Sequence, residues 1–478
     1  MTRSVSAHRP RECRRLVEAS VLLIAATQLL GCSVGPTYRR PAMPAPPRWS
    51  ESGGVGSATV SSVWPAQEWW QAFGSARLDA LIAEAERNND DLKAAAARIE
   101  EADAQVRIAG APLLPTLSAT GLAQRARAPA PIVGQTLGNT FYPALTATYE
   151  LDFWGKNRAL RDAALAAARG SRYDRETVAL TLISSVARTY FQVLELEDRL
   201  RVARQNLANG EEILRGLTSE QAAGTATGLD VAQQDTAVAL LYAAIPPLEE
   251  QQHQNVYALA LLLGRTPESL DAGTGSLTEL ATPPVAAGLP SELLERRPDV
   301  ASAEEQLIAA NADIVAARAA LFPSIVLTAG GGYESSVLAS LVNPAHRVYS
   351  LAGSLTQPIF EGGALRGQVA YDKARYIELL ADYHKTVITA LSDVESALVA
   401  AAQSGEQQRR QQDAVDKARK AYEYSRAQLE AGTVNVLTVL NTENALFSAQ
   451  DALVQIEYTH LQALIDLYTA LGGGWKRA

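Results

Sequence analysis

The most reactive side chains of this sequence are its two cysteines, Cys13 and Cys32. Cys32 closes the string Leu-Leu-Gly-Cys at 29–32, which resembles the lipobox of bacterial lipoproteins. In that motif the leader is cut before the cysteine, and the thiol is then acylated. The sequence therefore predicts a lipidated Cys32; the alternative is an export signal that happens to contain a cysteine.

Residues 1–31 have the pattern of a bacterial export signal. Basic residues crowd its start, and an apolar run follows from Val21 to Leu30. This run is shorter than the roughly 20 apolar residues that span a bilayer. Ser33 follows Cys32, at a position where an aspartate would favour retention in the inner membrane. We therefore expect a lipoprotein signal peptide over 1–31 and delivery of the mature chain to the outer membrane.

Other reactive patterns are missing from the sequence. It contains no HExxH, no P-loop and no CxxC motif. The glycines at 330–332 lie in an expected strand and precede no helix, so they do not form a phosphate loop. His460 falls on an apolar heptad stripe, where a packed histidine is expected, and the net charge of -9 argues against nucleic-acid binding. We expect no enzyme, no cofactor and no metal site.

The composition favours long helices. The chain has 478 residues, of which 47% are hydrophobic but only 6% aromatic, and alanine supplies much of the hydrophobic share. Residues 32–66 are rich in proline, glycine and serine. We expect them to form an extended, lipid-anchored segment before the fold begins.

The rest of the chain contains an internal repeat with an offset of 208 residues. The landmarks that recur are Asp91 and Asp299, Pro115 and Pro323, the Ala-Gly-Thr strings at 223–225 and 431–433, and the Leu-Gly pairs at 263–264 and 471–472. The sequence therefore predicts two copies of one unit, 67–264 and 298–472. A linker over 265–297 joins them, and a tail follows over 473–478.

Heptad spacing of apolar residues predicts three helices in each copy, with a β-hairpin after the first. The expected bounds are 90–111 and 298–320 for the first helices, 113–154 and 321–361 for the hairpins, 156–223 and 364–431 for the long helices, and 227–263 and 435–471 for the last helices. A helix over 156–223 would be about 100 Å long, too long for a globular core. We expect an antiparallel coiled-coil wall, in which Pro246 and Pro247 interrupt and kink the last helix of the first copy.

The hairpins have the alternation of membrane-spanning strands. Over 140–153 apolar and polar residues alternate strictly, and 114–124, 322–333 and 347–360 alternate more weakly. Four strands are too few to close a barrel, and open strand edges are not tolerated in lipid. The chain must therefore oligomerise, and a trimer would supply about 12 strands. The alternative is a soluble sheet that caps a helical bundle.

Several strings together resemble one known family. They are CSVGPTYRRP at 32–41, WWQAFGSARLDALIAEA at 69–85, YELDFWGKNR at 149–158, ERRPDVASAE at 295–304, LTQPIFEGG at 355–363 and YTALGGGW at 468–475. These strings, and their order along the chain, are similar to those of outer-membrane efflux factors of the TolC type, in the lipoprotein branch of OprM-like and NodT-like channels. The strings are distributed over nearly the whole mature chain.

The resemblance implies an α+β membrane protein of Gram-negative bacteria. Four strands per chain would form a trimeric 12-stranded transmembrane β-barrel, continuous with a long periplasmic α-helical barrel. The linker 265–297 and the chain ends would form an equatorial region. Such a homotrimer is the exit duct of a tripartite efflux pump, with a periplasmic adaptor (membrane fusion) protein and an inner-membrane RND-type pump as partners. The alternative is a lipid-anchored periplasmic coiled-coil scaffold or adaptor without a pore.

The resemblance also places a periplasmic gate at the helix tips. The tips correspond to the two repeated turns, which contain Gly224 and Thr225 in the first copy and Gly432 and Thr433 in the second. A glycine adopts positive φ readily at a helix end, and a threonine after it can cap the next helix. A turn that makes few contacts is where local opening is cheap.

A pore constriction is implied just after the second turn. The leucine ring of OprM-like channels falls on Leu437, and their acidic ring falls on Asn441. Because Asn441 is uncharged, the sequence departs from the pattern, and Asp230, Asp235 or Glu443 are the nearby acids. The alternative for Leu437 is ordinary packing within the coiled coil.

Overall fold

A computed structural model describes residues 34–43, 46, 48–50, 64–130, 134–270, 275–284 and 290–477. The predicted signal peptide and Cys32 lie outside the described residues. The chain divides into two compact units. The first unit comprises Met1–Pro41, Ile99–Gly170 and Ala303–Tyr383, and the second comprises Ala42–Arg98, Ser171–Ser302 and His384–Ala478.

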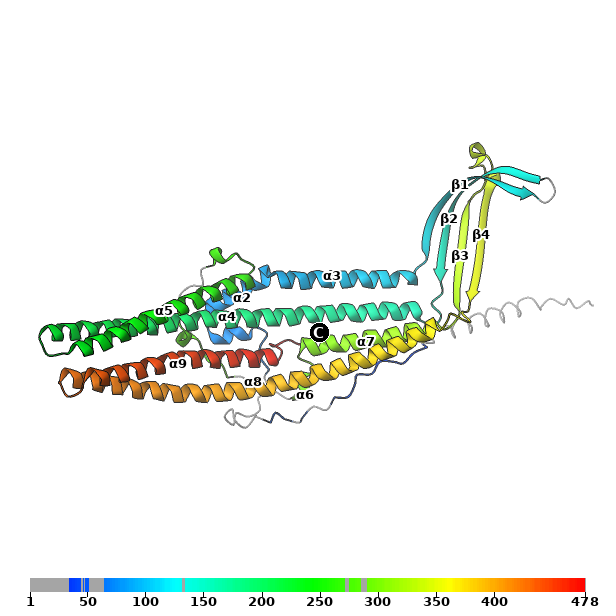
Figure 1. Cartoon of the computed structure of the whole chain (residues 1–478). Coiled ribbons are helices and arrows are strands. Elements are labelled where there is room, and N and C mark those ends of the chain that lie inside the picture. The colour runs from blue at the N-terminus through cyan, green and yellow to red at the C-terminus, as the bar shows by residue number, and fades with distance from the viewer. Residues whose placement is uncertain are drawn as a thin grey trace, which may run out of the picture. The chain divides into compact units, whose positions relative to one another are not determined.

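Each copy of the repeat supplies three long helices (Figure 1). Those of the first copy are α3 (Asp90–Gly110), α4 (Lys156–Ala222) and α5 (Gly228–Leu262), and those of the second are α7 (Pro298–Ala319), α8 (Ala364–Glu430) and α9 (Val436–Ala470). Every end lies within one residue of the end that heptad spacing predicts. The apolar heptad pattern ends where the helix no longer packs against a neighbour. Glycines at the turns end the long helices sharply, so the sequence marks these helix ends well.

The expected interruption at Pro246 and Pro247 is wrong, because α5 continues through both prolines. Their neighbours Ile245 and Leu248 pack against a buried cluster that includes Leu196 of α4. The two prolines cannot donate backbone hydrogen bonds. The packing of the residues before and after them keeps the helix continuous.

A short helix that is absent from the sequence prediction belongs to the second unit. Helix α2 (Ala76–Asn88) begins at Ser75, whose hydroxyl accepts a hydrogen bond from the Leu78 amide at 3.2 Å. It is preceded by a 3₁₀ turn over Trp69–Phe73, in which Trp69 stacks on Tyr468 of α9 with ring centroids 4.9 Å apart. This aromatic contact ties the start of the first copy to the end of the second.

One four-stranded antiparallel sheet lies in the first unit, with the order β1-β2-β3-β4 (Figure 1). The strands are β1 (Thr116–Ala130), β2 (Gly134–Glu150), β3 (Ser324–Tyr333) and β4 (Arg347–Thr356). β2 pairs with β3 only from Ala144 to Glu150, so the first hairpin continues beyond the sheet as a two-stranded ribbon. The ribbon is longer than the alternation predicts, because backbone pairing between two strands needs no buried face.

The two hairpins have the same register. Thr116 pairs with Thr148 in the first, and Ser324 pairs with Thr356 in the second, each partner being displaced by 208 residues. The repeat seen in the sequence is therefore also a repeat of strand pairing.

Among the described helices, α4 contains the one stretch that is long and apolar enough to cross a membrane. Half of this stretch is buried within the protein, as expected for a helix of the core. Buried α4 side chains such as Phe191 and Leu196 support that interpretation.

Candidate functional site

The turn between α4 and α5 is closed by a left-handed glycine. Gly224 has a φ of 81°, and its amide donates to the Gln221 carbonyl at 3.0 Å. The Thr225 amide donates to the Glu220 carbonyl at 2.9 Å. These two bonds make a Schellman motif, which satisfies the last carbonyls of α4 and reverses the chain.

The turn between α8 and α9 repeats this geometry. Gly432 has a φ of 71°, and its amide donates to the Leu429 carbonyl at 2.9 Å. The Thr433 amide donates to the Gln428 carbonyl, also at 2.9 Å. The two Ala-Gly-Thr strings therefore specify two equivalent helix tips.

The expected capping role of Thr225 and Thr433 is wrong. Each hydroxyl donates back to a carbonyl of the preceding helix, at 3.0 Å. The next helices are capped two residues later, by Thr227, which forms a capping box with Asp230, and by Asn435. The left-handed glycine turns the threonine after it back toward the preceding helix. The N-cap of the next helix is therefore a residue further along the chain.

Both tips have open surroundings. A Cβ atom added at Gly224 or Gly432 would meet no atom within 4 Å. The turns therefore rest on their own backbone hydrogen bonds more than on packing, which makes local rearrangement cheap.

Two exposed leucines mark the first turns of the helices that follow. Leu437, the second residue of α9, is 47% exposed, and its repeat equivalent Leu229 in α5 is 66% exposed. Asn441 is exposed one turn after Leu437, on the same side of α9. Packing within the chain therefore covers only part of the Leu437 side chain. Leu229 was absent from the sequence prediction, although the 208-residue offset indicates it.

Glu443 lies away from this exposed side. It is 5% exposed and faces the seam that buries Val439 and Leu446. Its Oε1 atom has no hydrogen-bond partner among the described residues. Burial raises the pKa of Glu443 to about 7. A carboxyl that is buried and unpaired cannot supply an exposed acidic ring.

Of the other two acids near the tips, Asp235 is exposed and Asp230 is partly exposed. Asp230 accepts hydrogen bonds from the Thr227 hydroxyl and amide, which lower the pKa of its carboxyl. Asp235, which is the repeat equivalent of Glu443, lies on α5 without the burial of its counterpart. The two copies therefore differ in the charge that they bury.

Ion pairs join the helices of the two copies in the second unit. Arg199 of α4 contacts Asp451 of α9 at 2.7 Å, and Arg426 of α8 contacts Glu212 of α4 at 3.1 Å. The second pair is mostly exposed, so its contribution to stability is small. The apolar cluster of Val415, Tyr422, Val439 and Leu446 is the main contact beside it.

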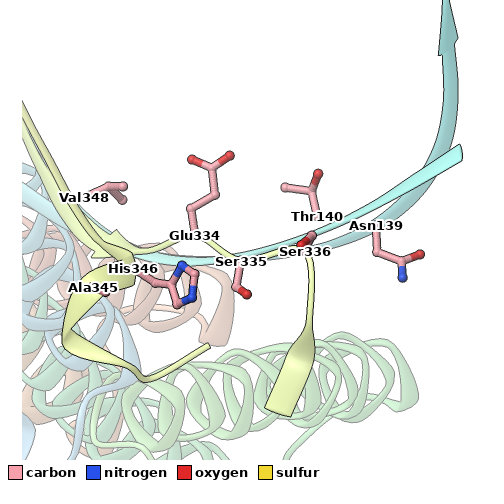
Figure 2. Close-up of a pocket in the computed structure, with 8 residues that line it drawn as sticks. All are labelled: Asn139, Thr140, Glu334, Ser335, Ser336, Ala345, His346 and Val348. Carbon is pink, nitrogen blue, oxygen red and sulfur yellow. The ribbon is translucent and has the colours of Figure 1, made fainter. Parts of the chain in front are cut away.

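A polar hollow of about 400 Å³ lies in the first unit, near the end of β3 (Figure 2). The Glu334 and Thr140 side chains point to one side of the ribbon, and those of Ser335 and Asn139 to the other (Figure 2). The backbone is already paired there, because the Glu334 amide donates to the His346 carbonyl at 2.9 Å. The polar groups do not converge, so the hollow is not a binding site.

The profile of a known family matches most of the chain. It is described as outer membrane efflux protein and matches residues 81–265 and 289–473. The chain belongs to this family. The two matched segments correspond to the two copies, so an outer membrane efflux protein is expected to carry the internal repeat seen here.

Individual outer membrane efflux proteins are similar along nearly their whole length. The pyoverdine export outer membrane protein OpmQ of Pseudomonas aeruginosa is 41% identical, over 95% of this chain and 96% of its own. The OpmQ of Pseudomonas putida is 39% identical, over 95% and 97%. The solved structure of the outer-membrane channel OprN is 27% identical, with a TM-score of 0.88 over 93% of this chain and 100% of that chain.

These findings confirm the predicted fold class and function. The outer membrane efflux protein is an α+β channel that assembles as a homotrimer, in which four strands per chain form the transmembrane barrel and long helices form the helical barrel. It lies in the outer membrane of a Gram-negative bacterium and is an exit duct. Members of the family are transport channels rather than enzymes.

Proposed function

We propose that this channel exports an iron-chelating siderophore of the pyoverdine kind. The observation that supports this cargo is the similarity to two pyoverdine export proteins, at 41% and 39% identity over nearly the whole chain. The duct works with a periplasmic adaptor and an inner-membrane RND-type pump, which supplies the energy. The chain itself catalyses no reaction in this proposal.

The cargo is tested by deleting the gene in the host bacterium. We expect the iron chelator to accumulate in the periplasm and to fall in the medium, and the wild-type gene to reverse both changes. Ethidium efflux, measured in the same cells, serves as a control for general drug export. If the level of chelator in the medium were unchanged while ethidium efflux was lost, the channel would still be an exit duct, but the proposed cargo would be wrong.

We propose that Cys32 carries the lipid anchor, in agreement with the Leu-Leu-Gly-Cys string before it. The Cys32→Ala chain should incorporate no radiolabelled palmitate, whereas the Cys13→Ala chain should be labelled as fully as the unsubstituted chain. Labelling of the Cys32→Ala chain would show that another residue is acylated.

We also propose that the helix tips form the gate, with the turns at Gly224–Thr225 and Gly432–Thr433 as its moving ends and with Leu437 and Asn441 at the constriction. The open surroundings of the turns and the exposure of Leu437 support this proposal. The sides of α9 that are buried within the chain are already occupied, so its exposed side is the one free to line a pore.

The Asn441→Asp variant tests the constriction. A carboxylate attracts a cation about 4 Å away by about 1 kcal/mol in water, so cation selectivity in single-channel recordings should rise roughly fivefold. The Asn255→Asp variant adds the same charge to a partly exposed position of α5, far along the helix from its first turn, and should leave selectivity unchanged. Equal effects of the two variants would mean that Asn441 does not face the pore.

A further inference from the structure

A hollow of about 510 Å³ lies on one face of the sheet, across β2, β3 and β4. Its lining includes Pro115, Ala147, Tyr149, Leu327, Ala329 and Leu351. The strand register explains the space, because Ala147 lies directly opposite Ala329 and the next pair on the same face is Tyr149 and Leu327. Two small side chains beside larger ones leave a depression with an apolar lining. Its volume is in the range of about 300 to 1,000 Å³ that small-molecule pockets have.

The face that carries the hollow is the one that meets lipid in the trimeric barrel. Residues two apart on a strand share a face, and so do residues directly opposite on neighbouring strands. The face of the hollow therefore also carries Leu145, Leu351 and Leu355, which are 55%, 80% and 68% exposed. The other face carries hydroxyl residues such as Thr148 and Thr328. Transmembrane barrels are apolar outside and polar inside, so the hollow opens toward the acyl chains of the membrane.

Aromatic residues mark the foot of the sheet, where β3 begins. Trp154 stacks on Phe322 with ring centroids 4.7 Å apart, and its indole donates to the Pro323 carbonyl at 2.8 Å. Tryptophan rings collect at the level of the lipid headgroups. On a strand tilted by about 40°, Leu327 and Ala329 of the hollow lie roughly 8 and 13 Å above the start of β3. One leaflet supplies about 15 Å of hydrocarbon, so an acyl chain that starts at the foot reaches the hollow.

The described N-terminal segment, residues 34–41, runs along α7 toward this foot (Figure 1). The Tyr38 hydroxyl donates to the Glu304 carboxylate at 3.4 Å. Further along α7, the Asn311 side-chain amide donates to the Pro36 carbonyl at 3.0 Å. Lower residue numbers in the segment therefore meet higher residue numbers in α7, which leads directly into β3.

The start of the described chain lies close to the sheet. Gly35 packs so closely on Val315 that an added Cβ atom would overlap that side chain. Val315 is about 6 Å along the helix axis from the end of α7 at Ala319. The chain then turns tightly, since the Phe322 amide donates to the Ala319 carbonyl at 3.1 Å. Cys32 precedes Gly35 by three residues and reaches up to about 11 Å from it, far enough to arrive at the foot.

We propose that a fatty acyl chain carried by Cys32 lies in this hollow on the outer face of the sheet. The proposal rests on the lipidated Cys32 proposed above and adds a binding site for the acyl chain on the protein itself. A free phospholipid would lose its translational freedom by staying in the hollow, whereas the tethered chain has already lost it. The anchor is then attached to the barrel and not only to the bilayer.

A photoactivatable acyl chain tests this site in the full-length protein. The host is grown with a palmitate that carries a diazirine in its chain, so that Cys32 and the phospholipids both receive the probe. Isolated outer membranes are irradiated, and the crosslinked peptides of the purified trimer are identified by mass spectrometry. We expect the peptides that contain Tyr149 and Leu327 to be joined to the Cys32 peptide. The mass of each product distinguishes this bond from a bond to a phospholipid.

Two tryptophan variants show whether the hollow itself holds the acyl chain. Ala329→Trp fills the hollow and should lose most of the crosslinks between the Cys32 peptide and β2 or β3. Ala123→Trp places the same ring on the same face of the sheet, opposite Phe141 and outside the hollow, and should keep them. Ala147→Trp fills the hollow from β2 and is used if Ala329→Trp does not assemble. Undiminished crosslinks in a filled variant would overturn the proposal.

The unsubstituted chain separates failure of the site from failure of the anchor. A Cys32 peptide that carries no acyl chain would remove the lipid anchor and the acyl site together. A Cys32 peptide that carries the probe, but whose crosslinks avoid β2 and β3, would leave the anchor in place and overturn the site. Phospholipid joined to the β2 and β3 peptides in place of the Cys32 peptide would also overturn it, and would make a membrane lipid the occupant.

Discussion

Replacing Gly472 with alanine should lower the free energy of unfolding by roughly 2 to 4 kcal/mol per chain. Gly472 follows α9 with a φ of 83°, where an L side chain is strained. A Cβ atom there would overlap the carbonyl oxygen of Arg296. The loss therefore combines backbone strain with a clash against a main-chain atom.

The backbone beside Gly472 has little freedom to move away. Arg297, the residue after Arg296, contacts Asp299 at 2.6 Å and Asp393 of α8 at 3.0 Å, and its guanidinium is largely buried. It also donates to the Ala470 carbonyl at 3.3 Å. Relief of the clash would break these contacts or shift the end of α9.

The Gly432→Ala variant is the matched control. Gly432 has a similar φ of 71°, but a Cβ atom there has open space. It should lose only about 1 kcal/mol, from backbone strain alone. Thermal unfolding of the purified trimer, followed by circular dichroism, measures both variants. Equal losses would show that the close approach to Arg296 contributes nothing.

The Glu443→Gln variant should remove a pH dependence of stability. Glu443 has a pKa of about 7 in the folded protein because it is buried. Its ordinary value is 4.5, so the folded protein holds the proton more tightly than the unfolded chain does. The contribution of Glu443 to stability is therefore most favourable below about pH 4.5, falls between 4.5 and about 7, and stays lower above that.

The size of this effect follows from the same difference in pKa. At pH 8 a charged Glu443 costs roughly 3 kcal/mol per chain. Glutamine is neutral, so the variant should melt at a higher temperature than the wild type at pH 8 and at nearly the same temperature at pH 4.5. The measurement is the melting temperature of the detergent-solubilised trimer across this range of pH.

Glu406→Gln supplies the comparison for this experiment. Glu406 lies on an exposed part of α8, where hydrogen bonds from Arg409 and Arg410 lower its pKa. This variant should keep the fall in stability between pH 4.5 and 7. The explanation would be wrong if Glu443→Gln showed the same pH profile as the wild-type chain.

The long helices and the repeat could be predicted because their signals are local and periodic. Heptad stripes fix the faces of α4 and α8, and Gly224 and Gly432 mark where the stripes end. The sheet was predictable as four strands, since alternation depends only on which faces are wet. The extent of the first hairpin beyond the sheet was not, because pairing between two backbones leaves little trace in side chains.

The burial of Glu443 could not be predicted from its own neighbours in sequence. Its repeat equivalent, Asp235, also lies near a helix tip but is exposed. The difference arises from Tyr422 and the other side chains that α8 packs against α9, far away in sequence. Helix α2 was a different kind of omission, because Ser75 and the spacing of Leu78, Leu81 and Ile82 already indicate a capped amphipathic helix.

The common register of the two hairpins has a kinetic consequence. The β2–β3 junction forms between segments of one polypeptide, so its rate does not depend on how many chains are present. The junctions between chains form by collision, and their rate falls steeply on dilution. At low expression we therefore expect single chains to accumulate. Each has its own β2–β3 junction formed, and these make up half of the junctions between hairpins in a closed ring of three chains. Fusing three copies head to tail would place all three of the other junctions within one polypeptide, so that none of them would depend on collision.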